Sequence, residues 1–285
     1  GRHVLVLIDG VRVNDPSDPN KSFNPALLNV GDVERVEVLK GAQTLLYGSD
    51  AIGGVVNIIT KKGREKDSIT LNAGYSQGIQ LDNTFTFGDS ILHTHLFHDK
   101  AEGISAADGG DEDDGYENRG VTLNFFHSFS DKLEGDWTLK VTDQFSEIDN
   151  TDFSTGLPID SDGDYAKNIQ QLFSQKLNYR TGSGKLSHLL GFNKIDRFNK
   201  FGSFVLGSYG KELTNELHRN QKIENGFYLI GLENLSESFS QDALDEKVTG
   251  LTSLVLIRDY KKGSVFGQLG YRASHHTESG NNFSP

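Results

Sequence analysis

The sequence predicts an all-β protein whose larger part is a transmembrane antiparallel β-barrel, and three observations predict it. From residue 64 onward, apolar and polar residues alternate with a period of two in about eleven segments. The connections between these segments alternate between short and long. No run approaches the roughly 18 apolar residues that a membrane helix needs, whereas alternating barrel strands need no such run.

Composition and charge exclude several classes of protein. The chain has 285 residues, with 40 Asp+Glu against 28 Lys+Arg, and it has no Cys. The absence of Cys excludes a disulfide scaffold, a thiolate metal site and a cysteine nucleophile. The net charge of −12 argues against nucleic acid as the partner, because phosphates need a basic surface. No Ser, His and acid set and no nucleotide-binding motif is apparent, so we expect no enzymatic activity.

The first 63 residues form short bursts rich in Val and Ile, and each burst is closed by Gly. The bursts are VLVLIDG at 4–10, VERVEVLKG at 33–41 and GGVVNIITKKG at 53–63. This pattern predicts a strand in each burst. Turn-forming residues fill 14–20, and short helical turns are expected at 24–28 and 43–47.

The segments beyond residue 64 have the period of strands that bury one face. The clearest places Val121, Leu123, Phe125, His127 and Phe129 on one face. Their lengths of about 8 to 15 residues suit tilted barrel strands. The predicted strands lie near 68–75, 80–87, 90–98, 119–129, 136–148, 168–180, 184–198, 211–223, 226–234, 247–258 and 264–273.

The connections between these strands are sorted by length. Short connections are expected at 88–89, 130–135, 181–183, near 225 and at 259–263. Long connections are expected at 99–118, 149–167, 199–210, 235–246 and from 274 onward. Membrane barrels sort their connections in this way, with short periplasmic turns and longer outer loops. A soluble sandwich has no reason to do so.

Three motif blocks within the first 63 residues resemble a known family. The blocks VLVLIDGVR, VERVEVLKG and LYGSDAIGGVVNIITKK occur in that order, and they closely resemble the C-terminal half of the plug domain of TonB-dependent outer-membrane receptors. The form YGSDAIGGVVNIIT most resembles the vitamin B12 (cobalamin) receptor branch. The residues that carry the motif are Asp9, Gly10, Glu34, Arg35, Glu37, Gly41, Tyr47, Gly48, Gly53, Gly54 and Asn57.

The resemblance implies a domain organisation and a function. Residues 1–63 would be the C-terminal part of a small α/β plug domain in the lumen, and 64–285 the N-terminal half of a barrel of about 22 strands. The chain would be an excerpt that lacks the TonB-contacting box, and alone it would not fold as a native barrel. The expected function is TonB-dependent active transport of a scarce nutrient across the Gram-negative outer membrane. Cobalamin is the first candidate, and a siderophore or haem is the alternative.

Candidate site residues follow from this organisation. Substrate contacts are expected from Asn14, Asp15, Asp18 and Asn20 at the plug apex and from Tyr116 and Tyr165 in outer loops. Two acidic loops offer the hard oxygen ligands that Ca²⁺ prefers, although solvated acidic loops would look the same. Because cobalamin receptors order their loops with calcium, the resemblance adds Ca²⁺ as a cofactor, and no covalent cofactor is expected. The candidate ligands are Asp111, Asp113, Asp114, Asp160, Asp162 and Asp164.

Other side chains are expected to serve the barrel itself. His93 and His95 share a strand face and His98 lies on the other, so these residues indicate wall or interface histidines instead of a metal site. Glu34, Arg35 and Glu37 are expected to meet charges on the inner wall or to form a solvated, self-paired strand face. Trp137 and several Phe and Tyr residues are expected to form aromatic girdles that contact lipid. A soluble β-rich binding or adhesion module with calcium-ordered loops remains the alternative from another class.

Overall fold

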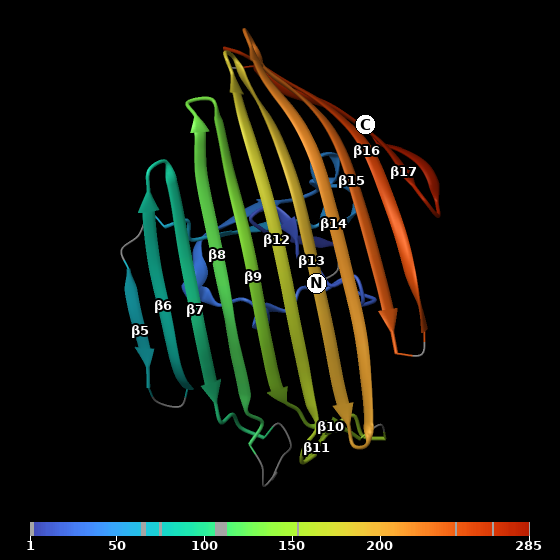
Figure 1. The fold of residues 1–285 in the computed structure, drawn as a ribbon. Helices are drawn as coiled ribbons and strands as arrows, with labels where there is room; N and C mark the ends of the chain where they lie inside the picture. Colours follow the sequence, from blue (N-terminus) through green and yellow to red (C-terminus); the bar gives the residue numbers. More distant parts are fainter. Residues whose placement is uncertain are drawn as a thin grey trace.

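A computed structural model of the chain describes residues 3–63, 67–73, 76–105, 113–152, 154–242, 244–263 and 265–284. Two main sheets are present, and the smaller one lies against the concave side of the larger (Figure 1). The smaller sheet ends at Thr60 and the larger begins at Ser68. None of the helices in these ranges is long and apolar enough to cross a membrane.

The smaller sheet is built from the Val- and Ile-rich bursts and has the order β2-β1-β4-β3. Strands β1 and β4 are parallel, and the other neighbouring pairs are antiparallel. The helical turns expected at 24–28 and 43–47 are confirmed by η1 and α1. The elements are β1 (Val4–Ile8), β2 (Val11–Arg12), η1 (Pro25–Leu27), η2 (Val30–Asp32), β3 (Val33–Lys40), α1 (Thr44–Tyr47), η3 (Ser49–Ala51) and β4 (Gly54–Thr60).

Glycine is required at the start of β4. Gly54 has φ +134°, and a Cβ there would lie 2.5 Å from the carbonyl oxygen of Leu39. Only glycine fits such a backbone so close to a neighbouring strand. This motif glycine therefore allows β3 to pair with β4.

The larger sheet has twelve antiparallel strands, in which chain neighbours pair throughout except that β12 pairs with β9. Each of the eleven predicted strands matches one of them, and β18 is an addition that the sequence did not reveal. The strands β10 (Asn150–Thr151) and β11 (Pro158–Ile159) form a separate small hairpin. The sheet comprises β5 (Ser68–Asn72), β6 (Ser76–Phe87), β7 (Ser90–Ala101), β8 (Tyr116–Ser130), β9 (Leu133–Glu147), β12 (Tyr165–Thr181), β13 (Gly184–Phe201), β14 (Phe204–Ile223), β15 (Gly226–Gln241), β16 (Leu244–Lys262), β17 (Val265–His276) and β18 (Gly280–Ser284).

The connections confirm part of the predicted sorting. The turns predicted to be short lie at one end of the sheet, while the connection after β7 and the one carrying β10 and β11 lie at the other, lower in Figure 1. The long connection predicted from 274 onward is wrong, because only 277–279 separate β17 from β18. The long loops predicted at 199–210 and 235–246 are wrong as well. There β13 runs to Phe201 before β14 starts at Phe204, and β15 runs to Gln241 before β16 starts at Leu244. Beyond the bilayer a strand no longer needs an apolar outer face, so the sequence pattern fades while the backbone ladder continues.

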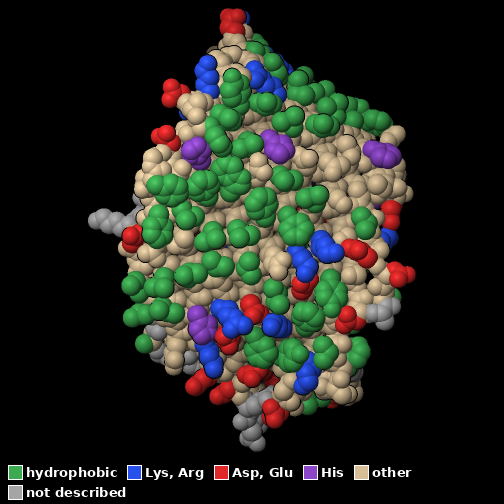
Figure 2. All heavy atoms as spheres, viewed as in Figure 1, with side chains coloured by type: hydrophobic (Ala, Val, Ile, Leu, Met, Phe, Trp, Pro, Cys, Tyr) green, Lys and Arg blue, Asp and Glu red, His purple; other side chains and the backbone are tan. Residues whose placement is uncertain are grey.

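The convex face of the sheet carries the apolar surface expected of a lipid-facing wall (Figure 2). One aromatic group lies near the short turns and contains Phe125, Phe129 and Trp137. A second lies near the long loops and contains Phe145, Tyr165, Phe198 and Tyr209. Trp137 and Phe145 are eight residues apart on β9. At about 3.3 Å per residue, the distance between them along the strand is roughly 26 Å. With a strand tilt of about 40°, this separation is about 20 Å along the membrane normal, which is close to an apolar band of about 25 Å and disfavours a soluble module.

An apolar contact joins the two sheets. Val6, Ile8, Val11 and Ile58 of the smaller sheet form a buried cluster with Leu172 of β12. The wall can approach closely because Gly191 of β13 has no side chain, and a Cβ there would lie 2.8 Å from Val11. The smaller sheet therefore rests on β12 and β13.

The charged side chains of β3 form the self-paired strand face that was one of the two predicted arrangements. Arg35 binds Glu34 at 3.0 Å and Glu37 at 2.8 Å, and nearly the whole strand is exposed. β3 is the edge strand of the smaller sheet, on the side away from β2 and the wall contact. Among the described residues these charges pair with one another, and their contact with a part of the inner wall outside this chain stays a prediction.

Candidate functional site

The segment that follows β2 forms a closed loop, here called the apex loop (residues 14–21), and Asn14 fastens it to β1. The side-chain oxygen of Asn14 accepts a hydrogen bond from the Val6 amide at 2.8 Å. Its side-chain nitrogen donates to the carbonyl oxygens of Val4 at 3.1 Å and Lys21 at 2.8 Å. One amide side chain thus ties both ends of the loop to the sheet.

Two carboxylates shape the interior of the apex loop. Asp15 accepts hydrogen bonds from the Ser17 amide at 2.8 Å and hydroxyl at 2.7 Å. Asp18 accepts from the amides of Asn20 at 3.0 Å and Ser22 at 3.2 Å. Burial alone would raise the pKa of Asp18, but the Ser22 hydroxyl and these amides outweigh it and lower that pKa. The loop therefore holds a fixed shape at neutral pH.

The Asn14→Leu variant is expected to release the apex loop. Leucine fills a similar volume but leaves two carbonyl oxygens and one amide of the strand and loop without their partner. Unpaired buried polar groups cost about 1–3 kcal/mol each, so the loop should detach and lose its shape. Amide hydrogen exchange at 14–22 should rise while exchange in β12 to β14 stays unchanged. Unchanged exchange in the loop would contradict this role for Asn14.

The apex loop also contacts the wall. Asp15 lies 3.2 Å from Arg197 of β13, and the Lys21 ammonium lies 2.8 Å from both carboxylate oxygens of Glu237 of β15. A cavity of about 240 Å³ separates the loop from the wall beside these pairs. Polar side chains line it, among them Arg12, Asn14, Asn20, Asp50, Glu212 and Glu237.

Arg12 is a buried cation at the edge of this cavity. It donates to the Asp50 carboxylate at 3.0 Å and to the carbonyl oxygen of Tyr47, which joins β2 to the turn after α1. Burial alone would lower the pKa of Arg12, but the carboxylates of Glu212 and Asp50 outweigh it and raise that pKa. Arg12 therefore stays charged and holds the motif residue Tyr47 in place.

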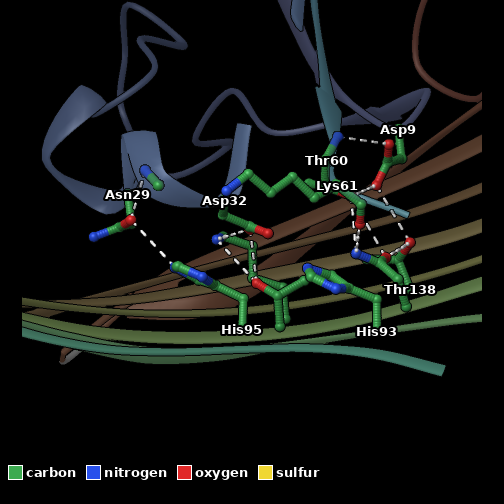
Figure 3. A network of polar contacts seen from close by, with 12 residues as sticks. Asp9, Asn29, Asp32, Thr60, Lys61, His93, His95 and Thr138 are labelled. Carbon is green, nitrogen blue, oxygen red and sulfur yellow. Dashed lines mark hydrogen bonds and ion pairs between the residues drawn. The ribbon is translucent and has the colours of Figure 1, made fainter. Parts of the chain in front are cut away.

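A second contact with the wall is polar and fully enclosed (Figure 3). Asp32, at the end of η2, binds the Lys140 ammonium of β9 at 2.9 Å and the Thr122 hydroxyl of β8 at 2.7 Å. The side chains of Asp32 and Lys140 are 0% and 1% exposed. Burial alone would raise the pKa of Asp32, but Lys140 and Thr122 outweigh it and lower that pKa. Asp32 is therefore ionised at neutral pH.

The neighbouring cross-strand pair of the wall receives a second carboxylate. Asn124 and Thr138 follow Thr122 and Lys140 on the same inner face. Asp9 accepts from the Thr138 hydroxyl at 3.2 Å, from the Thr60 hydroxyl at 2.6 Å and from Lys62 at 2.9 Å. The motif residue Asp9 therefore joins the end of β4 to the wall.

The histidines lie where the alternation predicted. His93 and His95 are buried on the inner face of β7, and His98 is exposed on the outer face. His95 lies 3.0 Å from Asp82 and 3.2 Å from Asn29, so it joins the smaller sheet's loops to the wall (Figure 3). Their prediction as wall and interface histidines is confirmed for these contacts.

The two predicted tyrosines lie on different faces of the wall. Tyr165 stacks near Phe145 at 5.4 Å between ring centroids, within the outer aromatic group near the long loops. Tyr116 shares its strand face with the buried Asn118 and lines a cavity of about 320 Å³ with Asp113 at the long-loop end. Phe145 of the outer aromatic group also lines this cavity, so the cavity does not separate Tyr116 from Tyr165 as a ligand contact.

The predicted calcium ligands are not gathered into one set. Asp111 lies outside the described residues, while Asp113, Asp160 and Asp162 are exposed. The buried Asp164 accepts from the Gly202 amide at 2.5 Å and so supports the β13–β14 turn. Within the described ranges, no three His, Cys, Asp or Glu side chains lie close enough to hold a metal ion. Calcium binding by these loops stays a prediction, because Asp111 and its neighbours at 106–112 lie outside the described residues.

Comparison with known proteins finds sequences that are similar to this chain. Residues 1–55 match the TonB-dependent Receptor Plug Domain. The vitamin B12 transporter BtuB of Vibrio vulnificus (strain CMCP6) is 30% identical over 200 residues, covering 64% of this chain and 32% of the relative. The predicted resemblance to TonB-dependent receptors is therefore confirmed.

Solved structures share the fold. The siderophore receptor PirA from Acinetobacter baumannii has a TM-score of 0.78 at 14% identity, over 99% of this chain and 50% of that chain. A mutant of the ferric enterobactin receptor PfeA from Pseudomonas aeruginosa has a TM-score of 0.77 at 14% identity, over 100% of this chain and 51% of that chain. The chain spans about half of these structures, and the fold prediction of a partial barrel with a plug is confirmed.

Proposed function

We propose that this chain, whose first 55 residues match the TonB-dependent receptor plug, forms part of an outer-membrane transporter for a scarce nutrient. The main observation that supports this proposal is the contrast between two kinds of contact. The wall strands are joined by continuous backbone ladders, whereas Asp9, Asp32 and Asn29 meet the wall through side-chain bonds. Water can replace such side-chain bonds, since ion pairs add little net stability over their solvated partners.

A movable plug in a rigid wall answers a physical problem of uptake. A receptor must bind a scarce ligand tightly and then release it inward, which one fixed site cannot do. The outer membrane holds no ATP, so in this proposal TonB couples the inner-membrane proton gradient to a shift of the plug. The ligand would bind from the long-loop end above the apex loop, and the polar contacts with β7 to β9 would open during the shift.

Cobalamin is the first candidate substrate. The 30% identical relative is a vitamin B12 transporter, which supports this choice. The structural neighbours are siderophore and ferric enterobactin receptors, which keeps iron chelates, siderophore or haem, as the alternative. Calcium belongs to the cobalamin proposal, where it would order the acidic loops at 108–116 and 160–164.

Equilibrium binding of cyanocobalamin to the complete receptor in detergent, with calcium and with chelator, tests this proposal. Tight binding that weakens on chelation is the expected result. Tight binding that chelation leaves unchanged would keep cobalamin and discard calcium. Absence of binding in both conditions would discard cobalamin, and a ferric catecholate and haem would then be titrated.

A further inference from the structure

The lipid-facing side of the wall carries a groove, here called the outer groove, that crosses β6 to β9. It encloses about 450 Å³ and opens on the convex face that Figure 2 shows. The side chains that line it are mostly apolar, and a charged group lies at one end. An amphipathic surface of this kind differs from the purely apolar face that lipid tails alone would require.

The strand register arranges the lining of the outer groove in two rows. The apolar row consists of directly paired residues of four strands, Leu81, Leu96, Val121 and Val141. The next outward row, two residues nearer the long loops, contains His98, Arg119 and Asp143. The outer groove therefore has an apolar body and a polar end, and the polar end lies on the long-loop side.

Cations outnumber carboxylates at the polar end. Arg119 lies 2.9 Å from Asp143 and 3.8 Å from Glu117, and Lys167 of β12 lies 3.6 Å from Asp143. Lys100 pairs directly with Glu117 and faces outward with it. Three permanent cations thus accompany two carboxylates here, although the whole chain has a net charge of −12. The local charge therefore favours an anionic ligand.

The Arg119 guanidinium keeps donors that an anion can use. Its Nε and one terminal nitrogen donate to the Asp143 carboxylate at 3.3 and 2.9 Å. The other terminal nitrogen lies 3.8 Å from Glu117, which is beyond hydrogen-bond distance, and the side chain is 61% exposed. A guanidinium that carboxylates hold in place and that still presents N–H groups is well suited to phosphate oxygens.

We propose that the outer groove binds a phosphorylated lipid of the outer leaflet, with an acyl chain on the apolar row and a phosphate at Arg119 and Lys167. Acyl chains contact this face in any case, because it is the lipid-facing wall, so the phosphate contact supplies the specificity. The long-loop end is the outer end of a membrane barrel, which places the phosphate in the outer leaflet. The inference rests on the membrane location in the proposed function, and it does not depend on the transported nutrient.

The test titrates the complete receptor in nonionic detergent with a bisphosphorylated glycolipid and with the same lipid after dephosphorylation, and native mass spectrometry measures the bound fraction. We expect wild type to prefer the phosphorylated form by about tenfold, and Arg119→Gln to remove most of this preference. Lys211→Gln is the matched control and should keep it, because Lys211 is another outward cation, 3.2 Å from Glu246. Val121→Phe fills the apolar row and should weaken binding of both forms.

The other results would overturn the inference in distinct ways. Equal binding of the two lipid forms by wild type, or equal losses in Arg119→Gln and Lys211→Gln, would remove the phosphate site. Unchanged binding in Val121→Phe would remove the acyl site, as would equally tight binding of water-soluble glucosamine phosphate. A wild-type dimer that Val121→Phe converts to a monomer would show that a second copy of the chain occupies the outer groove.

Nutrient binding, measured on the same samples, separates this inference from the proposed function. Arg119→Gln should bind the nutrient as wild type does, because Arg119 lies on the outer face of the wall. A wild-type receptor that binds the phosphorylated lipid but no nutrient would count against the proposed substrates and would support the outer groove as a lipid site. Nutrient binding without lipid preference would support the proposed function and overturn the inference alone.

Discussion

The Lys140→Met receptor is expected to seat its plug about 3–5 kcal/mol less stably than wild type, because the substitution leaves a buried carboxylate without its cation. Asp32 and Lys140 are both almost completely enclosed. Methionine keeps most of the aliphatic volume, so the loss reflects the charge and not a cavity. Denaturant unfolding of the complete receptor, together with proteolysis of residues 1–63, measures the effect.

A second substitution separates the ion pair from simple packing. Adding Asp32→Asn to Lys140→Met removes the uncompensated charge, so the double variant should recover part of the lost stability. Lys176→Met changes a more exposed lysine of β12 and serves as the matched control, with an expected effect near zero. Equal losses in Lys140→Met and Lys176→Met would contradict the role of the buried pair.

The same pair predicts a pH dependence with a definite sign. The pKa of Asp32 is lowered in the folded protein, so its ionised form stabilises the plug seat. That contribution is fully present above the unfolded pKa of about 3.9 and is lost as the pH falls through the lower folded pKa. Lys140→Met should flatten this part of the stability profile. If wild type and Lys140→Met lose the same stability at acid pH, the Asp32–Lys140 pair does not govern how the plug is seated.

The strands of the wall could be predicted because each must bury or expose one face. The period of two in Val121 to Phe129 is a direct consequence of an apolar exterior against a polar, plug-facing interior. The motif glycines were likewise informative, since Gly54 has a backbone that other residues rarely adopt. Such signals are local, and a sequence reveals local constraints well.

The strand extensions at 199–210 and 235–246 could not be predicted by the same reasoning. Residues 199–208 lie beyond the outer aromatic group formed by Phe198 and Tyr209, where no lipid demands an apolar face, and Ser240 pairs with Tyr209, so the turn after β15 lies beyond that group too. Gly202 and Ser203 form an ordinary two-residue turn, but the alternation that would have located the flanking strands is absent.

The sequence located the apex loop but did not reveal what its side chains bind. The apex loop was predicted from its turn formers, yet Asn14, Asp15 and Asp18 use their side chains to hold the loop together. The wall partners of the apex loop are far away in sequence, since Lys21 binds Glu237, which lies 216 positions later. Such pairings depend on the three-dimensional register of two sheets. The one available signal is a charged residue, such as Lys140, on the inner face of an alternating strand.

The register of the apex loop on the wall should be critical for ligand binding, and Gly210→Val tests it. A Cβ at Gly210 would lie 2.9 Å from both the Asp15 carboxylate and the Pro16 ring, and 3.2 Å from the Ser17 amide. Asp15 cannot turn aside without losing its bonds to Ser17 and to Arg197. Valine favours strands, so β14 itself should persist while the apex loop is pushed off the wall.

We expect Gly210→Val to weaken ligand binding by about tenfold to a hundredfold, since displacing the loop separates Lys21 from Glu237 and opens the apex cavity between them. Gly267→Val is the matched control, because a Cβ there meets nothing within 4 Å and its backbone needs no glycine. Ligand titration of both receptors in detergent, with their thermal stabilities alongside, measures the difference. Wild-type affinity in Gly210→Val would mean that the ligand does not use the apex loop in this register, and the site would then have to lie higher, among the long loops alone.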